Sequence, residues 1–201
     1  MRAISLALGA CTAASLYSSS LVDFSQTPSS ALTPRRGAFS IWGLIYTLLI
    51  ACTVVVASLR GEVKLLPHVL VCVSLAITCA WSLTVSRSRG LAVLALISSA
   101  LAAWTSLPFV KDNHLFSAAY GLLAGWLSVA VTISTELNDR RVLVVASSAI
   151  GAASVSLSTP WPVISLIWGL VGQLQIDRVV AGSAFIAVAC GATAVARLYV
   201  G

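Results

Sequence analysis

The sequence predicts an all-α fold, a polytopic integral membrane bundle of helices. Of the 201 residues, 59% are hydrophobic and only 9% are charged, whereas a soluble domain carries about 25% charged residues. The mean hydropathy of +0.99 means that many apolar side chains must face lipid, because one core cannot bury them all. The apolar runs are continuous and about 16 to 22 residues long, which favours spanning helices over the alternating strands of a barrel.

Short polar breaks divide the chain into eight apolar runs, each a predicted transmembrane helix. Eight helices of about 20 residues use about 160 positions, so no soluble domain is expected. The runs cover residues 3–22, 38–58, 67–85, 91–107, 115–135, 142–157, 161–174 and 179–200.

The first run has a second interpretation. Arg2 followed by an apolar stretch with small residues such as Ala10 and Ala13 is also typical of a secretory signal peptide. The sequence is numbered from Met1, and we expect this run to be retained as the first helix.

The next four runs end at polar positions that mark membrane surfaces, before Arg60, Arg87, Lys111 and Asp139. The Lys and Arg residues stand singly or in pairs between apolar runs, which is typical of membrane flanks and not of a phosphate-binding surface. The net charge of +6 therefore predicts no nucleic-acid partner.

The last three runs are less clearly divided. Only the uncharged stretch Ser158–Pro162 separates the sixth run from the seventh, and it could be a kink, which would give seven helices instead of eight. Asp177 and Arg178 precede the eighth run.

Orientation rests on the Lys and Arg residues of the breaks. Seven lie on one side and five on the side of the N-terminus, a weak bias toward an exterior N-terminus. The seven are Arg35, Arg36, Arg87, Arg89, Arg140, Arg141 and Arg178; the five are Arg2, Arg60, Lys64, Lys111 and Arg197.

The predicted spans carry no candidate catalytic or ion-pathway residue, because both histidines and all six acids fall at run ends or in loops. His68 and His114 lack the HExxH spacing of zinc proteases, and no serine has a GxSxG context. The cysteines show no CxxC pair and are interpreted as small buried hydrophobes. No enzyme activity, no metal site and no required cofactor is predicted. The cysteines are Cys11, Cys52, Cys72, Cys79 and Cys190.

Six tryptophans are the most unusual feature of the chain, and several lie inside runs and not at their ends. An interfacial belt accounts for Trp161 and Trp104. For the inner tryptophans, lining of a planar apolar ligand and plain core packing stay open. Trp42 and Tyr46 stand four apart on one helix face. The tryptophans are Trp42, Trp81, Trp104, Trp126, Trp161 and Trp168.

Gly121 and Gly125 form a GxxxG pair in the fifth run, just before Trp126. Such a pair lets a neighbouring helix approach closely. We interpret these two glycines as helix-packing residues.

The stretch FSIWGLIY, Phe39 to Tyr46, preceded by Thr33 and Pro34, resembles the WxxxY signature of the tryptophan-rich sensory protein and translocator protein family (TspO/MBR). It is most similar to the longer branch with extra C-terminal helices. Weaker agreement follows in the expected order at Ala80–Trp81, Tyr120–Ala130 and Ile167–Gly172.

The resemblance implies a five-helix transmembrane core over residues 1–137 and C-terminal helices over 138–201 packed on it as one membrane domain. Family members bind tetrapyrroles, and some bind sterols, among aromatic side chains. The resemblance makes Trp42, Tyr46, Trp81, Tyr120 and Trp126 ligand-binding candidates. The chain has Thr78 and Ser134 where the family pattern has asparagines.

Two functions remain open. One is a non-enzymatic sensor, carrier or scavenger of a planar apolar ligand, such as haem, another porphyrin, a sterol or a lipid. The alternative is a structural accessory subunit of a larger membrane complex in which ligand binding is lost. A permease is disfavoured, since charged coupling sites are missing. The expected partners are membrane lipids and either a second copy or a larger complex, in a bacterial, mitochondrial or other organellar membrane.

Overall fold

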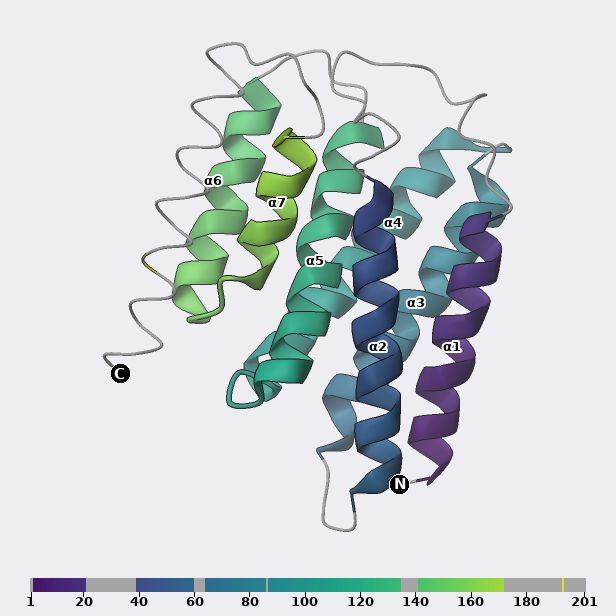
Figure 1. The fold of residues 1–201 in the computed structure, drawn as a ribbon. Helices are drawn as coiled ribbons and strands as arrows, with labels where there is room; N and C mark the ends of the chain where they lie inside the picture. Colours follow the sequence, from purple (N-terminus) through teal and green to yellow (C-terminus); the bar gives the residue numbers. More distant parts are fainter. Residues whose placement is uncertain are drawn as a thin grey trace.

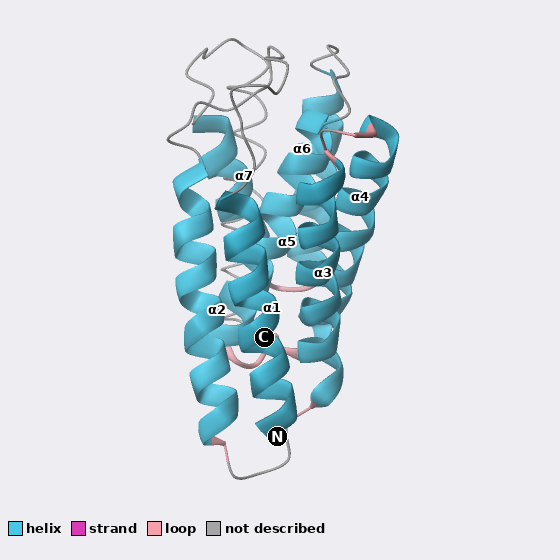
Figure 2. Cartoon of the chain, turned by 90° about the vertical axis from the view of Figure 1, so that its right-hand side faces the viewer, coloured by secondary structure: helices cyan, strands magenta, loops and turns pink. Residues whose placement is uncertain are grey.

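The computed structural model describes residues 2–20, 39–59, 64–85, 87–134, 141–171 and 193. Within these ranges the chain is helical and contains no strand, which confirms the predicted fold class (Figures 1 and 2). The elements are α1 (Arg2–Ser20), α2 (Ile41–Ser58), α3 (Leu65–Thr84), α4 (Arg89–Ser106), the 3-10 turn η2 (Leu107–Phe109), α5 (His114–Ser134), α6 (Arg141–Ser156) and α7 (Trp161–Val171).

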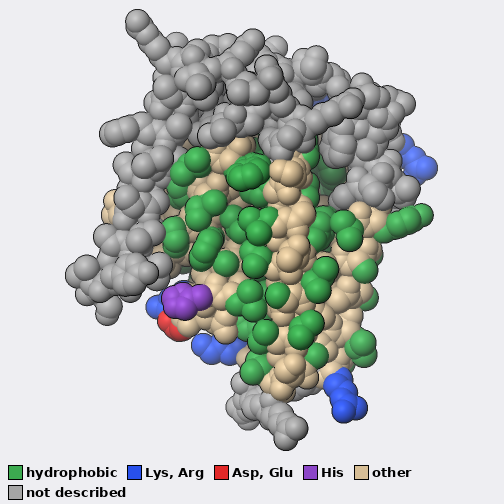
Figure 3. All heavy atoms as spheres, viewed as in Figure 1, with side chains coloured by type: hydrophobic (Ala, Val, Ile, Leu, Met, Phe, Trp, Pro, Cys, Tyr) green, Lys and Arg blue, Asp and Glu red, His purple; other side chains and the backbone are tan. Residues whose placement is uncertain are grey.

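Four of the described helices, α2 to α5, are long and apolar enough to cross a membrane. Large apolar side chains on their outer faces, such as Ile50, Val54 and Leu101, are exposed, as expected for helices that meet lipid. In Figure 3 the Lys and Arg side chains lie toward the two ends of the bundle, and apolar side chains cover the flank between them. The protein is therefore a multi-pass integral membrane protein.

The first five helices form a closed ring. Each contacts two others, in the order α1, α2, α5, α4, α3 and back to α1. Short connections make α2, α3, α4 and α5 run in alternating directions (Figure 1). One face of each helix therefore points into the ring and another points toward lipid.

α6 and α7 lie outside this ring and pack on α5 and on each other. α5 is consequently covered on nearly every side, and all residues from Phe116 to Leu127 are buried. Ser158 adopts a positive φ of 51° between α6 and α7, so the two are separate helices joined by a turn and not one kinked helix. Apart from Thr193, the predicted run 179–200 lies outside the described residues.

The GxxxG pair of α5 faces α7. A Cβ added to Gly121 would lie 2.6 Å from the Cβ of Trp161, and one added to Gly125 would overlap the backbone of Pro162. Both positions therefore require glycine for the observed approach of α7. A second link reinforces this contact, because the Ser165 hydroxyl of α7 donates to the Leu122 carbonyl at 2.7 Å.

Candidate functional site

The ring brings the candidate aromatic residues to two different levels. Trp42 and Tyr46 lie in the first turns of α2, and Trp81 lies near the C-terminal end of α3. Since α2 and α3 run in opposite directions, these three residues are at the same end, the top in Figure 1. We call them the upper aromatic group.

Trp42 and Tyr46 stack on each other, with ring centroids 5.3 Å apart and planes inclined by 19°. The Tyr46 ring is buried, and its hydroxyl shares a hydrogen bond of 3.0 Å with Ser15 of α1. The WxxxY spacing thus produces one aromatic pair, and a neighbouring helix holds its inner member in place.

Trp81 carries an unusual feature. Its indole Nε1 is buried and has no hydrogen-bond partner in the part of the chain that the structure describes. A buried donor without an acceptor destabilises a protein by about 1–3 kcal/mol. Such a donor is a candidate for recognition of a ligand atom.

Tyr120 belongs to a second group near the opposite end of the ring. Its ring is fully buried, and its oxygen lies 2.6 Å from Nδ1 of His68 on α3. Phe116 stacks on Tyr120 at 6.0 Å and meets the His68 ring edge to face at 5.0 Å. His68, Phe116 and Tyr120 form what we call the lower histidine group.

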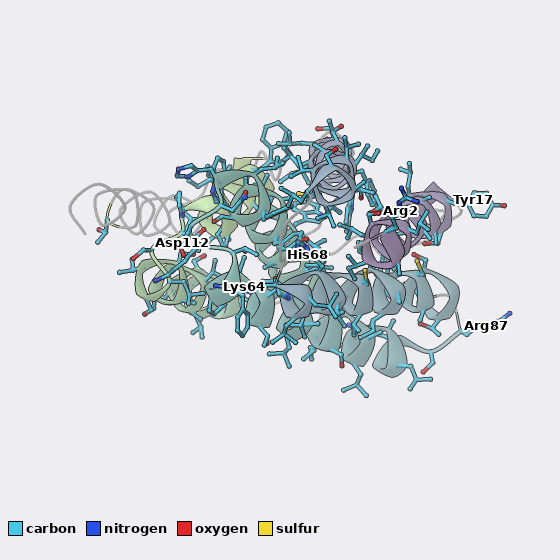
Figure 4. All side chains as sticks on the ribbon, turned by 90° about the horizontal axis from the view of Figure 1, so that it is seen from below. Arg2, Tyr17, Lys64, His68, Arg87 and Asp112 are labelled. Carbon is cyan, nitrogen blue, oxygen red and sulfur yellow. The ribbon has the colours of Figure 1, made fainter. Side chains whose placement is uncertain are left out.

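His68 was expected at the beginning of the third predicted run, and the structure places it in the first turn of α3, which begins at Leu65. This turn belongs to a helix that is long and apolar enough to cross a membrane. The His68 side chain is only 1% exposed, and Figure 4 shows it among the helices, whereas Arg87 projects outward. Tyr120 makes this burial tolerable by giving the imidazole a polar partner.

The two groups are well separated along the ring. Trp81 and His68 are thirteen positions apart on α3, which corresponds to about 20 Å of helix. One small planar molecule therefore does not contact both groups face on at once. An elongated ligand could reach from one group to the other.

Trp126 lies apart from both groups. It is buried and meets Phe39 edge to face at 5.9 Å, and a Cβ added to Gly169 of α7 would lie 3.6 Å from its ring. Six positions of helix turn Trp126 about 120° away from Tyr120 around α5. Trp126 thus packs between the start of α2 and α7, and Tyr120 faces α3.

Thr78, one of the two departures from the family pattern, is engaged in helix packing. Its hydroxyl lies 2.9 Å from that of Ser99 on α4 and donates to the Ser74 carbonyl at 2.9 Å. Ser74 and Ser99 also bond to each other across the same interface. Polar pairs of this kind hold transmembrane helices together.

The described cysteines include one close pair, because Cys11 and Cys72 share a side-chain hydrogen bond. Cys52 is buried, and Cys11, Cys72 and Cys79 are half-buried free thiols; Cys190 lies outside the described residues. Among the described residues, no three His, Cys, Asp or Glu side chains are close enough together to hold a metal ion.

The buried surface of the ring combines aromatic faces with a few polar groups. Aromatic faces suit a flat apolar molecule, and the Trp81 N–H and the His68 imidazole are polar groups among mostly apolar buried side chains. Small-molecule sites typically combine these features.

The model of the TSPO-like protein family matches residues 4–196, nearly the whole chain. No curated protein and no solved structure matches.

Proposed function

Because the chain belongs to the TSPO-like protein family, we propose that it holds a planar apolar ligand inside its five-helix ring and acts as a non-enzymatic sensor, carrier or scavenger. The ligand is a tetrapyrrole, such as protoporphyrin or haem, or a sterol of similar flatness. Membrane lipids surround the protein and supply the route by which such a molecule arrives.

The observation that carries this proposal is the unpaired indole N–H of Trp81 at the same end of the ring as the stacked Trp42 and Tyr46. Simple core packing would favour an apolar side chain there, because a buried donor without an acceptor is destabilising. A ligand that offers an acceptor to this N–H and a flat face to the two rings removes that penalty.

The test is a titration of detergent-purified protein with protoporphyrin IX, followed by tryptophan fluorescence. We expect saturable quenching at a fixed stoichiometry. Trp81→Phe keeps an aromatic face and removes the N–H, so it should weaken binding by roughly tenfold, the value of one hydrogen bond.

Trp168→Phe is the matched control. Trp168 is 45% exposed on α7, so its loss should lower the starting fluorescence without changing the affinity. Quenching no greater than that of free tryptophan in the same detergent would contradict the proposed function.

A structural subunit of a larger membrane assembly is the second candidate. Thr78, at a position where the family resemblance implies an asparagine, is bonded to Ser99 of α4 and holds two helices together. Purification in gentle detergent separates the two functions, because a stoichiometric large complex supports the subunit and a free monomer or dimer supports the binding protein.

A further inference from the structure

The lower histidine group contains a polar atom that the fold itself leaves unused. His68 is 1% exposed, and its Nδ1 lies 2.6 Å from the Tyr120 hydroxyl. The hydrogen bond to Tyr120 is the one that the His68 ring makes with the residues that the structure describes. The other ring nitrogen, Nε2, is not among the fully buried atoms that lack a partner, so it remains accessible to a ligand atom. A neutral imidazole has one donor and one acceptor nitrogen, so Nε2 needs a partner of the opposite kind.

Tyr120 determines whether Nε2 is a hydrogen-bond donor or an acceptor. Its hydroxyl is fully buried, and among the described residues His68 Nδ1 is the partner within hydrogen-bonding distance. If Nδ1 carried the proton, the Tyr120 O–H and the Nε2 lone pair would both be left without partners. When Tyr120 donates to Nδ1, only one group remains unpaired, and that group is an N–H at Nε2.

We propose that this Nε2–H is a hydrogen-bond donor for a ligand held at the lower histidine group, about 20 Å along α3 from Trp81, and that this end of the ring therefore selects apolar molecules that carry an oxygen acceptor, such as a carboxylate, over oxygen-free molecules of the same shape. The inference rests on the proposed function and specifies its ligand class. His68 lies in the first turn of α3, where the helix dipole also favours negative charge.

The same geometry disfavours metal coordination by His68. An iron atom needs the lone pair of Nε2, and that lone pair exists only in the tautomer that leaves the Tyr120 proton without an acceptor. The polar end of a tetrapyrrole is thus recognised by its oxygen atoms, and its metal is not bound through this imidazole.

The test compares two porphyrins on the purified full-length protein. Protoporphyrin IX carries propionate carboxylates, and octaethylporphyrin has a similar macrocycle without oxygen. We expect the wild type to bind protoporphyrin roughly tenfold more tightly. His68→Phe should abolish this preference, because it should weaken the binding of protoporphyrin and leave the binding of octaethylporphyrin unchanged. The control is His114→Phe, at the exposed start of α5, which should keep the preference for protoporphyrin.

The outcomes separate this inference from the proposed function. If neither porphyrin binds the wild type, the proposed function fails and the donor has no ligand. If both bind equally and His68→Phe changes neither affinity, the protein binds porphyrins but the role of His68 is refuted; a water molecule on Nε2 would give this result.

A second measurement does not depend on the variant folding. With both histidines of the wild type labelled by ¹⁵N, we expect the spectrum of His68 to show the proton on Nε2 at about pH 8.5, where a free imidazole is neutral. In Tyr120→Phe the preference for this tautomer should be lost. A proton found on Nδ1 in the wild type would overturn the inference.

Discussion

Gly43 and Gly125 are both helical glycines in apolar spans, but their surroundings are opposite. A Cβ on Gly125 would overlap the Pro162 backbone, and one on Gly43 would meet nothing within 4 Å. We therefore expect Gly125→Ala to lower the free energy of unfolding by about 1–3 kcal/mol through overpacking. Gly43→Ala should raise it by about 0.5–1 kcal/mol, because alanine is the better helix former.

Unfolding in detergent monitored by circular dichroism measures both changes. The two variants are expected to change the free energy of unfolding in opposite directions. This difference tests the close packing at Gly125, since a general intolerance of the membrane helices to substitution would destabilise both variants. Equal stability of Gly125→Ala and the wild type would mean that α7 does not approach α5 as closely as the structure places it.

Individual residues were predictable from sequence where the signal was local. The four-residue spacing of Trp42 and Tyr46 was enough to place them on one helix face, and they stack. The environment of His68 was not predictable, because its partner Tyr120 is 52 positions away in the chain. The contact of Trp126 with α7 near Gly169 is likewise between residues far apart in the chain, which no local pattern reveals.

At the level of elements, the hydroxyl cluster between α3 and α4 makes a specific prediction. Ser99 bonds Ser74 and Thr78 across the interface, and the adjacent Ser98 is exposed and bonds only the Leu94 carbonyl of its own helix. We expect Ser99→Ala to destabilise the protein by about 0.5–1.5 kcal/mol. Ser98→Ala should change stability by less than about 0.5 kcal/mol.

The comparison is made on the free energy of unfolding of the two purified variants. Loss of stability in both to the same extent would indicate that serine contributes through its own helix and not through the contact between α3 and α4.

Helix positions were predictable because lipid imposes a length and an apolar composition on every span. The predicted starts of α3 and α4, at residues 67 and 91, fall two residues later than the observed ones. α4 begins with Arg89 and Gly90, which the apolar run does not include, and α3 begins with two leucines that precede Pro67. The turn between α6 and α7 remained ambiguous in sequence, because the stretch Ser158–Pro162 holds no charge that would fix it at a membrane surface.

At the level of the whole molecule, the order of helices around the ring could not be read from hydropathy. Lipid-facing and core-facing side chains are equally apolar in a membrane protein, so the periodic pattern that orients a helix in water is weak. Contacts between α1 and α3 and between α2 and α5 close the ring, and an isolated hydroxyl pair, Ser15 with Tyr46, adds a specific contact between α1 and α2.

The alternating helices predict which loops share a membrane surface. Lys64 precedes α3 and Lys111 precedes α5, whereas Arg87 follows α3, and all three side chains are exposed. Lys64→Cys and Lys111→Cys should therefore react with a membrane-impermeant maleimide from one side, and Arg87→Cys from the other, in a background lacking the native cysteines.

The side on which they react tests the orientation separately. In the assignment made from the sequence, seven of the twelve Lys and Arg residues fall on the side of Arg87, so the positive-inside rule predicts that this surface lies in the cytoplasm or its equivalent and the N-terminus outside. Labelling of Lys64→Cys and Arg87→Cys from the same side would contradict the passage of α3 through the bilayer. Labelling of Arg87→Cys from outside, with Lys64→Cys protected, would agree with the ring but would show that its orientation in the membrane is the reverse of the predicted one. The orientation rests on a weak charge bias, whereas the crossing of the bilayer by α3 rests on its length and apolar composition.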